Sequence, residues 1–270
     1  MDFTVGKYKA LQQALTGRGY AFRTFLQFME SPGTDKTVVL RHDVDRLPGN
    51  ALHLGLLEHE MDIRSTYYFR IVPQSFDPDI IRQISGLGHE IGYHYEDLSM
   101  AAKSAGAGRP DPARQPVPPE LMEKAIAQFE LHLEQLRELA PVKTICMHGS
   151  PLSRWDNRKL WERYDYRDYG IAGEPYFDVD YSQVFYITDT GRSWRKSDAN
   201  VRDRVDSGFD LQVRSTSHLI RLAEAGRLPG RIMINTHPQR WHDPGFRWFR
   251  ELIWQNTKNI GKSFVSRMYR

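Results

Sequence analysis

The chain has 270 residues and a single cysteine, Cys146. One cysteine excludes an internal disulfide framework and a zinc site built from cysteines. Cys146 lies inside an apolar run that is typical of a buried strand. This position favours an inert, buried thiol over a reactive nucleophile.

Long apolar runs and a strong excess of one charge are also missing. No stretch approaches the roughly 20 apolar residues that span a bilayer, and residues 1–7 lack the apolar run and cleavage site of a signal peptide. The formal net charge is only +3 at pH 7, which gives no general case for nucleic-acid binding. We therefore expect a cytoplasmic protein with no nucleic-acid partner and no transmembrane segment.

Aromatic residues, in contrast, are plentiful at 12% of the chain. Such a content suits a carbohydrate or another substrate with a polar ring, although any single aromatic residue more often packs in the core. The tail at 246–270 adds six Lys or Arg side chains to one Glu, a local charge of about +5. It predicts a basic C-terminal helix, either packed with a solvated basic face or in contact with a membrane surface.

Four short apolar runs each end in residues that bind metals or transfer protons. Short runs rich in Val and Ile, separated by helical patterns, indicate buried parallel strands. In barrels of such strands, active sites lie at the carboxyl ends, where these polar residues fall. The runs continue into His42-Asp43-Val44-Asp45, His94-Tyr95-Glu96-Asp97, His148-Gly149-Ser150 and His237-Pro238.

The alternation of strand and helix patterns continues through most of the chain and favours one α/β barrel. An open doubly wound sheet is the alternative, but it would normally carry a Gly-rich phosphate loop after the first strand. Here that strand ends in His-Asp-Val-Asp instead. A helical pattern opens the segment 7–30, and further helices are expected at 48–61, 77–87, 120–139 and 215–225.

Asp43 and Asp45 are two residues apart, so on a strand they share a face. Two carboxylates at that spacing repel each other unless a cation lies nearby. A divalent metal bound by one of them, with the other as general base, resolves the conflict. Asp45 alone has a structural alternative, as the cap of the helix that begins near Pro48.

Three histidines follow strands. His94 lies beside Glu96 and Asp97, and an imidazole with carboxylates suits Zn²⁺, or Mn²⁺, Fe²⁺ or Co²⁺ when more oxygens are present. His148 also follows a strand. His237 is placed to act as a general acid at a metal-bound water or an oxyanion.

At these residues the chain resembles the polysaccharide deacetylase superfamily, that is, carbohydrate esterase family four with the NodB-homology domain. Residues 40–45 look like its first motif, residues 88–94 like its second, and residues 232–237 like its last. The resemblance covers about residues 37–240. It implies a distorted parallel (β/α) barrel of about seven strands as a single domain over 1–270, with a divalent metal that is usually zinc.

The resemblance also implies roles for individual residues. Asp43 is the general base, Asp45 and His94 are metal ligands, and His237 protonates the leaving group. The family's second metal histidine normally follows four residues after the first, where this chain has Leu98. The third ligand must therefore come from elsewhere, with His148 as first choice and Glu96 or Asp97 next.

The sequence thus predicts a metal-dependent hydrolase that cleaves an amide, such as an N-acetyl group, or an ester on a carbohydrate-like substrate. Zn²⁺ is the expected metal, with Mn²⁺, Fe²⁺, Co²⁺ or Ni²⁺ as alternatives. Glu174, Asp189 and Trp194 are expected to contact the substrate. Two other functions stay open: a metal-independent hydrolase of cyclic amides, and a non-catalytic glycan-binding module on the same barrel.

Overall fold

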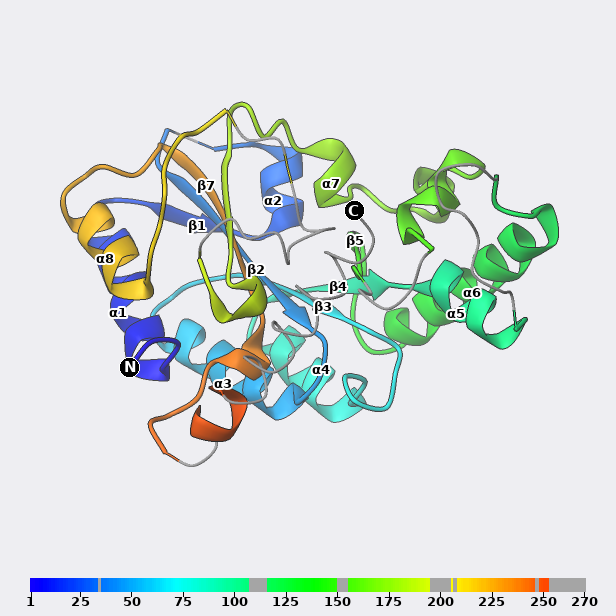
Figure 1. Ribbon diagram of the computed structural model, residues 1–270, viewed down its shortest axis with the longest axis horizontal. Helices are drawn as coiled ribbons and strands as arrows, with labels where there is room; N and C mark the ends of the chain where they lie inside the picture. The colour runs from blue at the N-terminus through cyan, green and yellow to red at the C-terminus, as the bar shows by residue number, and fades with distance from the viewer. Residues whose placement is uncertain are drawn as a thin grey trace, which may run out of the picture.

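The computed structural model describes residues 1–33, 35–106, 116–149, 155–194, 205, 208–245 and 248–252. A parallel sheet runs through its centre (Figure 1). The strands follow the order β5-β4-β3-β2-β7-β6, and β1 lies beside β2. They are β1 (Ala21–Arg23), β2 (Thr37–Val44), β3 (Thr66–Phe69), β4 (Glu90–Tyr95), β5 (Ile145–Met147), β6 (Phe185–Thr188) and β7 (Arg231–Thr236).

Every pairing in this sheet is parallel. The α/β class is therefore confirmed, and the sheet forms a half-barrel. Within the described ranges no pairing joins β5 to β6, so closure into a full barrel is not shown. An isolated parallel bridge between Thr144 and Gly173 extends the sheet beyond β5.

Helices cover the sheet on its two faces and at its ends (Figure 1). Helices α1 and α8 pack side by side at one end, and α5 and α6 pack at the other. The α-helices are α1 (Val5–Gly17), α2 (Phe25–Glu30), α3 (Pro48–Glu60), α4 (Pro78–Gly86), α5 (Asp97–Ser104), α6 (Pro119–Arg137), α7 (Pro175–Asp178) and α8 (Thr216–Glu224). Short 3₁₀ turns are η1 (Asn157–Glu162), η2 (Tyr166–Tyr169), η3 (Thr190–Arg192) and η4 (Pro238–Arg240).

Local sequence explains where several of these helices begin. Thr24 and Gln27 form a reciprocal capping box at α2, and the Asp77 side chain accepts the backbone N–H of Ile80 at the start of α4. Pro48 provides the first residue of α3, where a missing N–H has no cost. These signals place the helix starts that follow the strands.

Strand β2 is the centre of the molecule, and all eight of its residues are buried. It pairs with β7 along residues 37–42 and with β3 along residues 41–44. Its apolar half, Val38 to Leu40, packs in the core, where each fully buried aliphatic side chain contributes about 1.5–3 kcal/mol. Its carboxyl-terminal half carries the polar residues into the interior.

Gly92 in β4 is required by packing. A Cβ at this position would lie 2.4 Å from the Tyr68 ring and 3.0 Å from the Thr144 carbonyl oxygen. The missing side chain therefore lets the neighbouring strand place a large buried ring against β4.

The structure corrects the prediction from sequence in three places. The helix expected to open the segment 7–30 is α1, which ends at Gly17, but the sequence did not predict β1 and α2, which follow it. Helix α5 follows β4 directly where no helix was expected. The apolar pair at residues 171–172 also predicts a short strand from the sequence, and the structure reduces it to the single bridge at Gly173.

Only the beginning of the predicted basic C-terminal helix lies within the described residues. Residues 248–252 are helical, and Glu251 is buried against Arg46, with which it forms two hydrogen bonds of 2.7 Å. Residues 253–270, and with them the predicted membrane-surface contact, lie outside the described part. In the described part, no helix has both the length and the apolar character needed to cross a bilayer.

Candidate active site

Strand β2 sends its alternate residues to two different environments. Arg41 and Asp43 share one face, and His42 and Val44 share the other, as the two-residue period of a strand requires. The parallel register then aligns Val44 of β2 with Phe69 of β3, and Phe69 with Tyr93 of β4. The residues that follow these positions therefore meet at one edge of the sheet.

Asp45, His94 and His148 gather at that edge. One ligand atom from each lies within 4.8 Å of the other two. Asp45 Oδ1 is 3.6 Å from His94 Nε2 and 3.5 Å from His148 Nε2. The three residues come from the carboxyl ends of β2, β4 and β5, so three strands of the sheet hold the group.

The spacing of these atoms fits a tetrahedral metal. Zinc bonds to nitrogen and oxygen are about 2.0–2.2 Å long, which places neighbouring ligand atoms roughly 3.3–3.5 Å apart. Hydrogen bonds between the same atoms would be shorter. Asp45 Oδ1 is indeed a buried atom with no hydrogen-bond partner in the described structure. The arrangement of the three residues is therefore more typical of ligands around a divalent cation than of side chains hydrogen-bonded to one another.

The other polar atoms of the three residues are held by further groups. His94 Nδ1 lies 2.9 Å from the Cys146 carbonyl oxygen, and His148 Nδ1 lies 2.9 Å from Glu96 Oε2. Gln239 donates its amide N–H to Asp45 Oδ2 at 2.9 Å. Such contacts fix the ring orientations and leave both Nε2 atoms directed at the site.

Glu96 therefore supports His148 and does not compete with it. Arg70 donates from Nε to Glu96 Oε1 at 2.7 Å and also from Nη2. Burial would raise the pKa of Glu96, but the hydrogen bond from His148 and the charge of Arg70 lower the pKa to about 2. Asp97, the other alternative ligand, lies in a separate buried cluster, where it accepts hydrogen bonds from Tyr93 and lies 2.7 Å from His132 Nδ1.

A second group, formed by Asp43, His94 and Cys146, also has ligand atoms within 4.8 Å of one another. Arg41 already lies there, with Nη1 2.9 Å from Cys146 Sγ and Nη2 3.4 Å from Asp43 Oδ2. A fixed positive charge at this position opposes a metal ion. The group around Asp45 is therefore the better metal site.

Asp43 is positioned by two groups outside the set of residues predicted to form the site. Arg41 on the same strand face provides a charge, and Asn235 Nδ2 on β7 donates to Asp43 Oδ2 at 2.9 Å. Burial would raise the pKa of Asp43, but Arg41 and His94 lower the pKa below its ordinary value. Asp43 Oδ1 is buried and has no partner in the described structure, so one carboxylate oxygen is available for a proton.

Arg41 is itself fully buried, inside a set of aromatic rings. Its guanidinium carbon lies 5.6–5.9 Å from the ring centroids of Tyr68, Tyr176 and Tyr186. Cation–π contacts of this kind become stronger when water is excluded. The only sequence signal for this arrangement was the two-residue spacing between Arg41 and Asp43.

His237 follows β7 and is oriented by Asp189. Its Nδ1 lies 2.6 Å from Asp189 Oδ1, and its backbone N–H donates to Asp189 Oδ2 at 3.1 Å. Arg240 and Trp241 donate to the same carboxylate at 2.7 and 2.8 Å. Arg240 Nη1 also lies 2.9 Å from His237 Nδ1. In the tautomer that carries its proton on Nδ1, His237 donates to the carboxylate, and Nε2 is left for another partner.

Asp189, which the sequence predicts to contact the substrate, is instead the partner of His237. Asp189 is fully buried, and four donors surround its two oxygens. Its carboxylate therefore orients His237 and is not open to a substrate. Burial would raise the pKa of Asp189, but Arg240 and His237 lower the pKa below its ordinary value.

Glu174 and Trp194 also have partners within the protein. Glu174 is fully buried and accepts the backbone N–H groups of Met147 and Tyr176, and burial raises its pKa to about 7. Trp194 donates its indole N–H to Thr216 at 2.9 Å and lines a cavity of about 430 Å³. Contact of these two residues with a substrate stays a prediction.

The remaining sequence expectations concern single residues. Cys146 is fully buried, and burial raises the pKa of its thiol well above its usual value, as expected of an inert cysteine. Asp45 does not cap α3, because Leu47 occupies the cap position without a side-chain hydrogen bond. The structural alternative for Asp45 is therefore wrong.

Comparison with known proteins gives a distant likeness among solved structures. No family model matches the chain, and no curated protein matches it. Among solved structures, the chain is similar to a peptidoglycan N-acetylglucosamine deacetylase crystallised with 4-naphthalen-1-yl-N-oxidanyl-benzamide. The two sequences are 17% identical, the match covers 84% of each chain, and the TM-score is 0.39.

Proposed function

We propose that the protein is a metal-dependent hydrolase that cleaves an amide, such as an N-acetyl group, or an ester on a carbohydrate-like substrate. The observation that carries this proposal is the group formed by Asp45, His94 and His148. Its ligand atoms have the spacing of metal ligands, and each side chain is held through its other polar atom. This group favours a metal-dependent reaction over the metal-independent alternative.

Asp45 Oδ1, His94 Nε2 and His148 Nε2 would hold the metal and leave a fourth position open, as in catalytic zinc sites. Two imidazoles and one carboxylate suit zinc. When bound, such a metal polarises the substrate carbonyl and lowers the pKa of a water molecule. The remaining functional residues of the site move protons.

Asp43 would take the proton of the attacking water through its free oxygen, Oδ1. Arg41 and Asn235 hold the other oxygen, so the carboxylate is oriented and ionised before a substrate arrives. General bases of this kind contribute about 10²–10⁴ in rate. The low pKa of Asp43 in the metal-free protein is consistent with an anion that is ready to accept a proton.

His237 would donate a proton to the leaving nitrogen or oxygen. Asp189 accepts from His237 Nδ1 and so directs Nε2 away from the core. The pair resembles the His–Asp arrangement in which the carboxylate sets the tautomer of a catalytic imidazole. Base and acid thus lie on neighbouring strands, β2 and β7, beside the same metal group.

Elemental analysis tests the proposal. The metal content of the purified wild type and of His148→Ala is measured before and after chelation. We expect about one zinc per chain in the wild type and a large loss in the variant. A screen of N-acetylated sugars and acetyl esters should then show turnover that chelation removes and added Zn²⁺ restores. A wild-type protein that takes up no divalent metal, or that turns over substrate equally well after chelation, would overturn the mechanism.

A further inference from the structure

The two aspartates of the candidate active site share a one-sided pattern of hydrogen bonds. Asp43 Oδ2 accepts from the side-chain amide of Asn235, and Asp45 Oδ2 accepts from the side-chain amide of Gln239, each at 2.9 Å. The Oδ1 atom of each carboxylate is buried and has no hydrogen-bond partner in the described structure. One oxygen of each aspartate is therefore held by an amide of the protein, and the other oxygen can accept a further partner.

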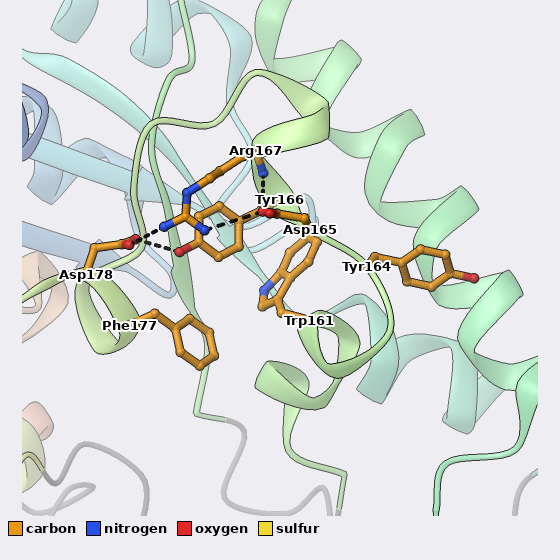
Figure 2. Close-up of a pocket in the computed structure, with 7 residues that line it drawn as sticks. All are labelled: Trp161, Tyr164, Asp165, Tyr166, Arg167, Phe177 and Asp178. Atoms are coloured by element: carbon orange, nitrogen blue, oxygen red, sulfur yellow. Dashed lines mark hydrogen bonds and ion pairs between the residues drawn. The ribbon is translucent and has the colours of Figure 1, made fainter.

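A carboxylate elsewhere in the chain shows the more usual condition. Asp178 accepts from Arg167 at Oδ1 and from the Tyr166 hydroxyl at Oδ2, at 2.7 Å in each case (Figure 2). Among the buried carboxylate oxygens of the described residues, only Asp43 Oδ1 and Asp45 Oδ1 lack a hydrogen-bond partner. The one-sided pattern is therefore a feature of the candidate active site.

The orientation of the Gln239 amide follows from the chemistry of its partner. A carboxylate only accepts hydrogen bonds, so the atom of Gln239 that faces Asp45 Oδ2 must be the donor, Nε2. The reversed amide would place two acceptor oxygens against each other. Gln239 therefore acts on Asp45 as a hydrogen-bond donor.

The turn η4, which carries Gln239, is anchored to α3. Asn50 on that helix donates its side-chain N–H to the carbonyl oxygens of Pro238 and Trp241, at 3.2 Å each. His242 Nε2 lies 2.9 Å from the carbonyl oxygen of Gln239, which is itself only 3% exposed. Because these contacts hold the turn, the amide is in place before anything binds at the metal group.

The free oxygen of Asp45 faces the two histidines. Asp45 Oδ1 is 3.6 Å from His94 Nε2 and 3.5 Å from His148 Nε2. A carboxylate can bind a metal through one oxygen or through both. Binding through both would make the metal compete with Gln239 for Oδ2, and a buried N–H that loses its acceptor is unfavourable. The hydrogen bond therefore favours binding through Oδ1 alone.

The number of oxygens that Asp45 supplies decides whether a coordination position stays open. Two imidazoles and one oxygen make three protein ligands, and catalytic zinc sites of this kind keep the next position for water or substrate. A second carboxylate oxygen would compete for that position. It would also reduce the ability of the metal to polarise a carbonyl.

We propose that Gln239 is a positioning residue that keeps Asp45 a one-oxygen ligand and so keeps one coordination position open for the substrate carbonyl. The inference rests on the proposed function, because it takes a metal to be bound by Asp45, His94 and His148. It deepens that function by assigning control of the open position to a residue outside the ligand set.

Cobalt substitution of the full-length chain tests the proposal, because Co²⁺ accepts the ligands of zinc and absorbs visible light, whereas d¹⁰ Zn²⁺ does not. Tetrahedral Co²⁺ absorbs more strongly than Co²⁺ with additional ligands. In Gln239→Met, which keeps the length of the side chain but has no N–H, the visible absorbance per bound Co²⁺ should fall by about half or more. Elemental analysis of the same samples gives the Co²⁺ bound per chain.

Two further variants accompany Gln239→Met. Gln239→Asn is the milder change, because it keeps an amide but shortens the side chain by one methylene, and its absorbance should fall as well. Gln83→Met is the matched control, because Gln83 is exposed on α4, and its spectrum should equal that of the wild type. Thermal melts of all variants check that the fold is retained.

Activity provides a second measurement. With zinc bound at wild-type stoichiometry, the kcat/KM of Gln239→Met for an acetylated substrate should fall about 10–100-fold. Gln83→Met should retain the wild-type value.

A wild-type absorbance per Co²⁺ in both Gln239 variants would overturn the proposal, and so would a wild-type spectrum that already shows additional ligands. A chain that binds neither Co²⁺ nor Zn²⁺ would overturn it together with the proposed function. Otherwise the two fail separately. If the spectrum depends on Gln239 but the wild type hydrolyses no acetylated sugar or ester, the positioning role stands and the hydrolase does not. If the wild type hydrolyses a substrate and the spectrum is the same in all variants, the hydrolase stands and the positioning role does not.

Discussion

The two faces of strand β2 carry two buried polar clusters that differ in one respect. Behind the strand, His42, Glu58 and His89 form a closed cluster, in which every side-chain nitrogen and oxygen has a partner. In front of it, Asp43 and Asp45 each keep one buried oxygen without a partner in the described structure. The first arrangement is complete in itself, whereas the second leaves two carboxylate oxygens able to accept a further partner.

The closed cluster shows how the protein normally treats a buried charge. Glu58 accepts from Tyr8, Tyr67 and Ser65 and lies 2.9 Å from His42 Nε2. Burial would raise the pKa of Glu58, but His42 and the surrounding donors lower the pKa to about 2. Asp43 and Asp45, in contrast, each keep one oxygen without a partner in the described structure. This contrast supports the roles proposed for them, Asp43 as base and Asp45 as metal ligand.

The largest expected effect is a loss of activity when the cluster in front of β2 is changed. Asp43→Asn removes the proposed base and should lower kcat about 10²–10⁴-fold, while bound metal stays at wild-type stoichiometry. Steady-state kinetics and elemental analysis on the same preparation measure both. Asp79→Asn, an exposed aspartate on α4, should leave both unchanged. Full activity in Asp43→Asn would exclude Asp43 as the base.

A substitution in the closed cluster should instead lower the stability of the fold. Glu58→Gln should lower the free energy of unfolding by about 3 kcal/mol, because it breaks a buried ionic and hydrogen-bonded cluster. Metal stoichiometry should be unchanged. Urea denaturation measures the loss, with the exposed Glu60→Gln on the same helix as the control. A variant as stable as the wild type would mean that the closed cluster is not structural.

A third substitution affects the support of the metal group without touching the metal. Glu96→Gln keeps the hydrogen-bond acceptor for His148 but removes the carboxylate charge, and should weaken metal affinity about 10-fold or more. Competition with a chelator of known affinity measures the change. The exposed Glu162→Gln should behave like the wild type. An unchanged affinity would show that Glu96 does not act on the metal through His148.

A further effect concerns pH and sharpens the description of the closed cluster. The pKa of Glu58 is about 2 in the folded protein, below its ordinary value of 4.5. Its stabilising contribution is therefore fully present above about pH 4.5 and is lost as the pH falls towards 2. The stability difference between wild type and Glu58→Gln should shrink by about 2 kcal/mol between pH 6 and pH 3. Urea titrations of both proteins with chelator present test this, and a difference independent of pH would contradict the ionised state of Glu58.

Much of the fold could be predicted from the sequence because its signals are local. The apolar runs before His42, His94, His148 and His237 lie in strands β2, β4, β5 and β7, as the patterns indicated. The helices after Pro48 and Asp77 begin at their proline and capping residues. Strand β1 and helix α5 were missed, since three strand residues and two helical turns are too short for a periodic pattern.

The sequence by itself determined which residues are candidates for chemistry: Asp43 and Asp45 at a two-residue spacing, and one histidine at the end of each of three strands. Only the tertiary structure decided how they combine. It brought His148 and not Asp97 to Asp45, made Asp189 the partner of His237, and placed Asn235 beside Asp43. The physical reason is that sheet register and packing bring together residues far apart in the chain, and no local pattern encodes those distances.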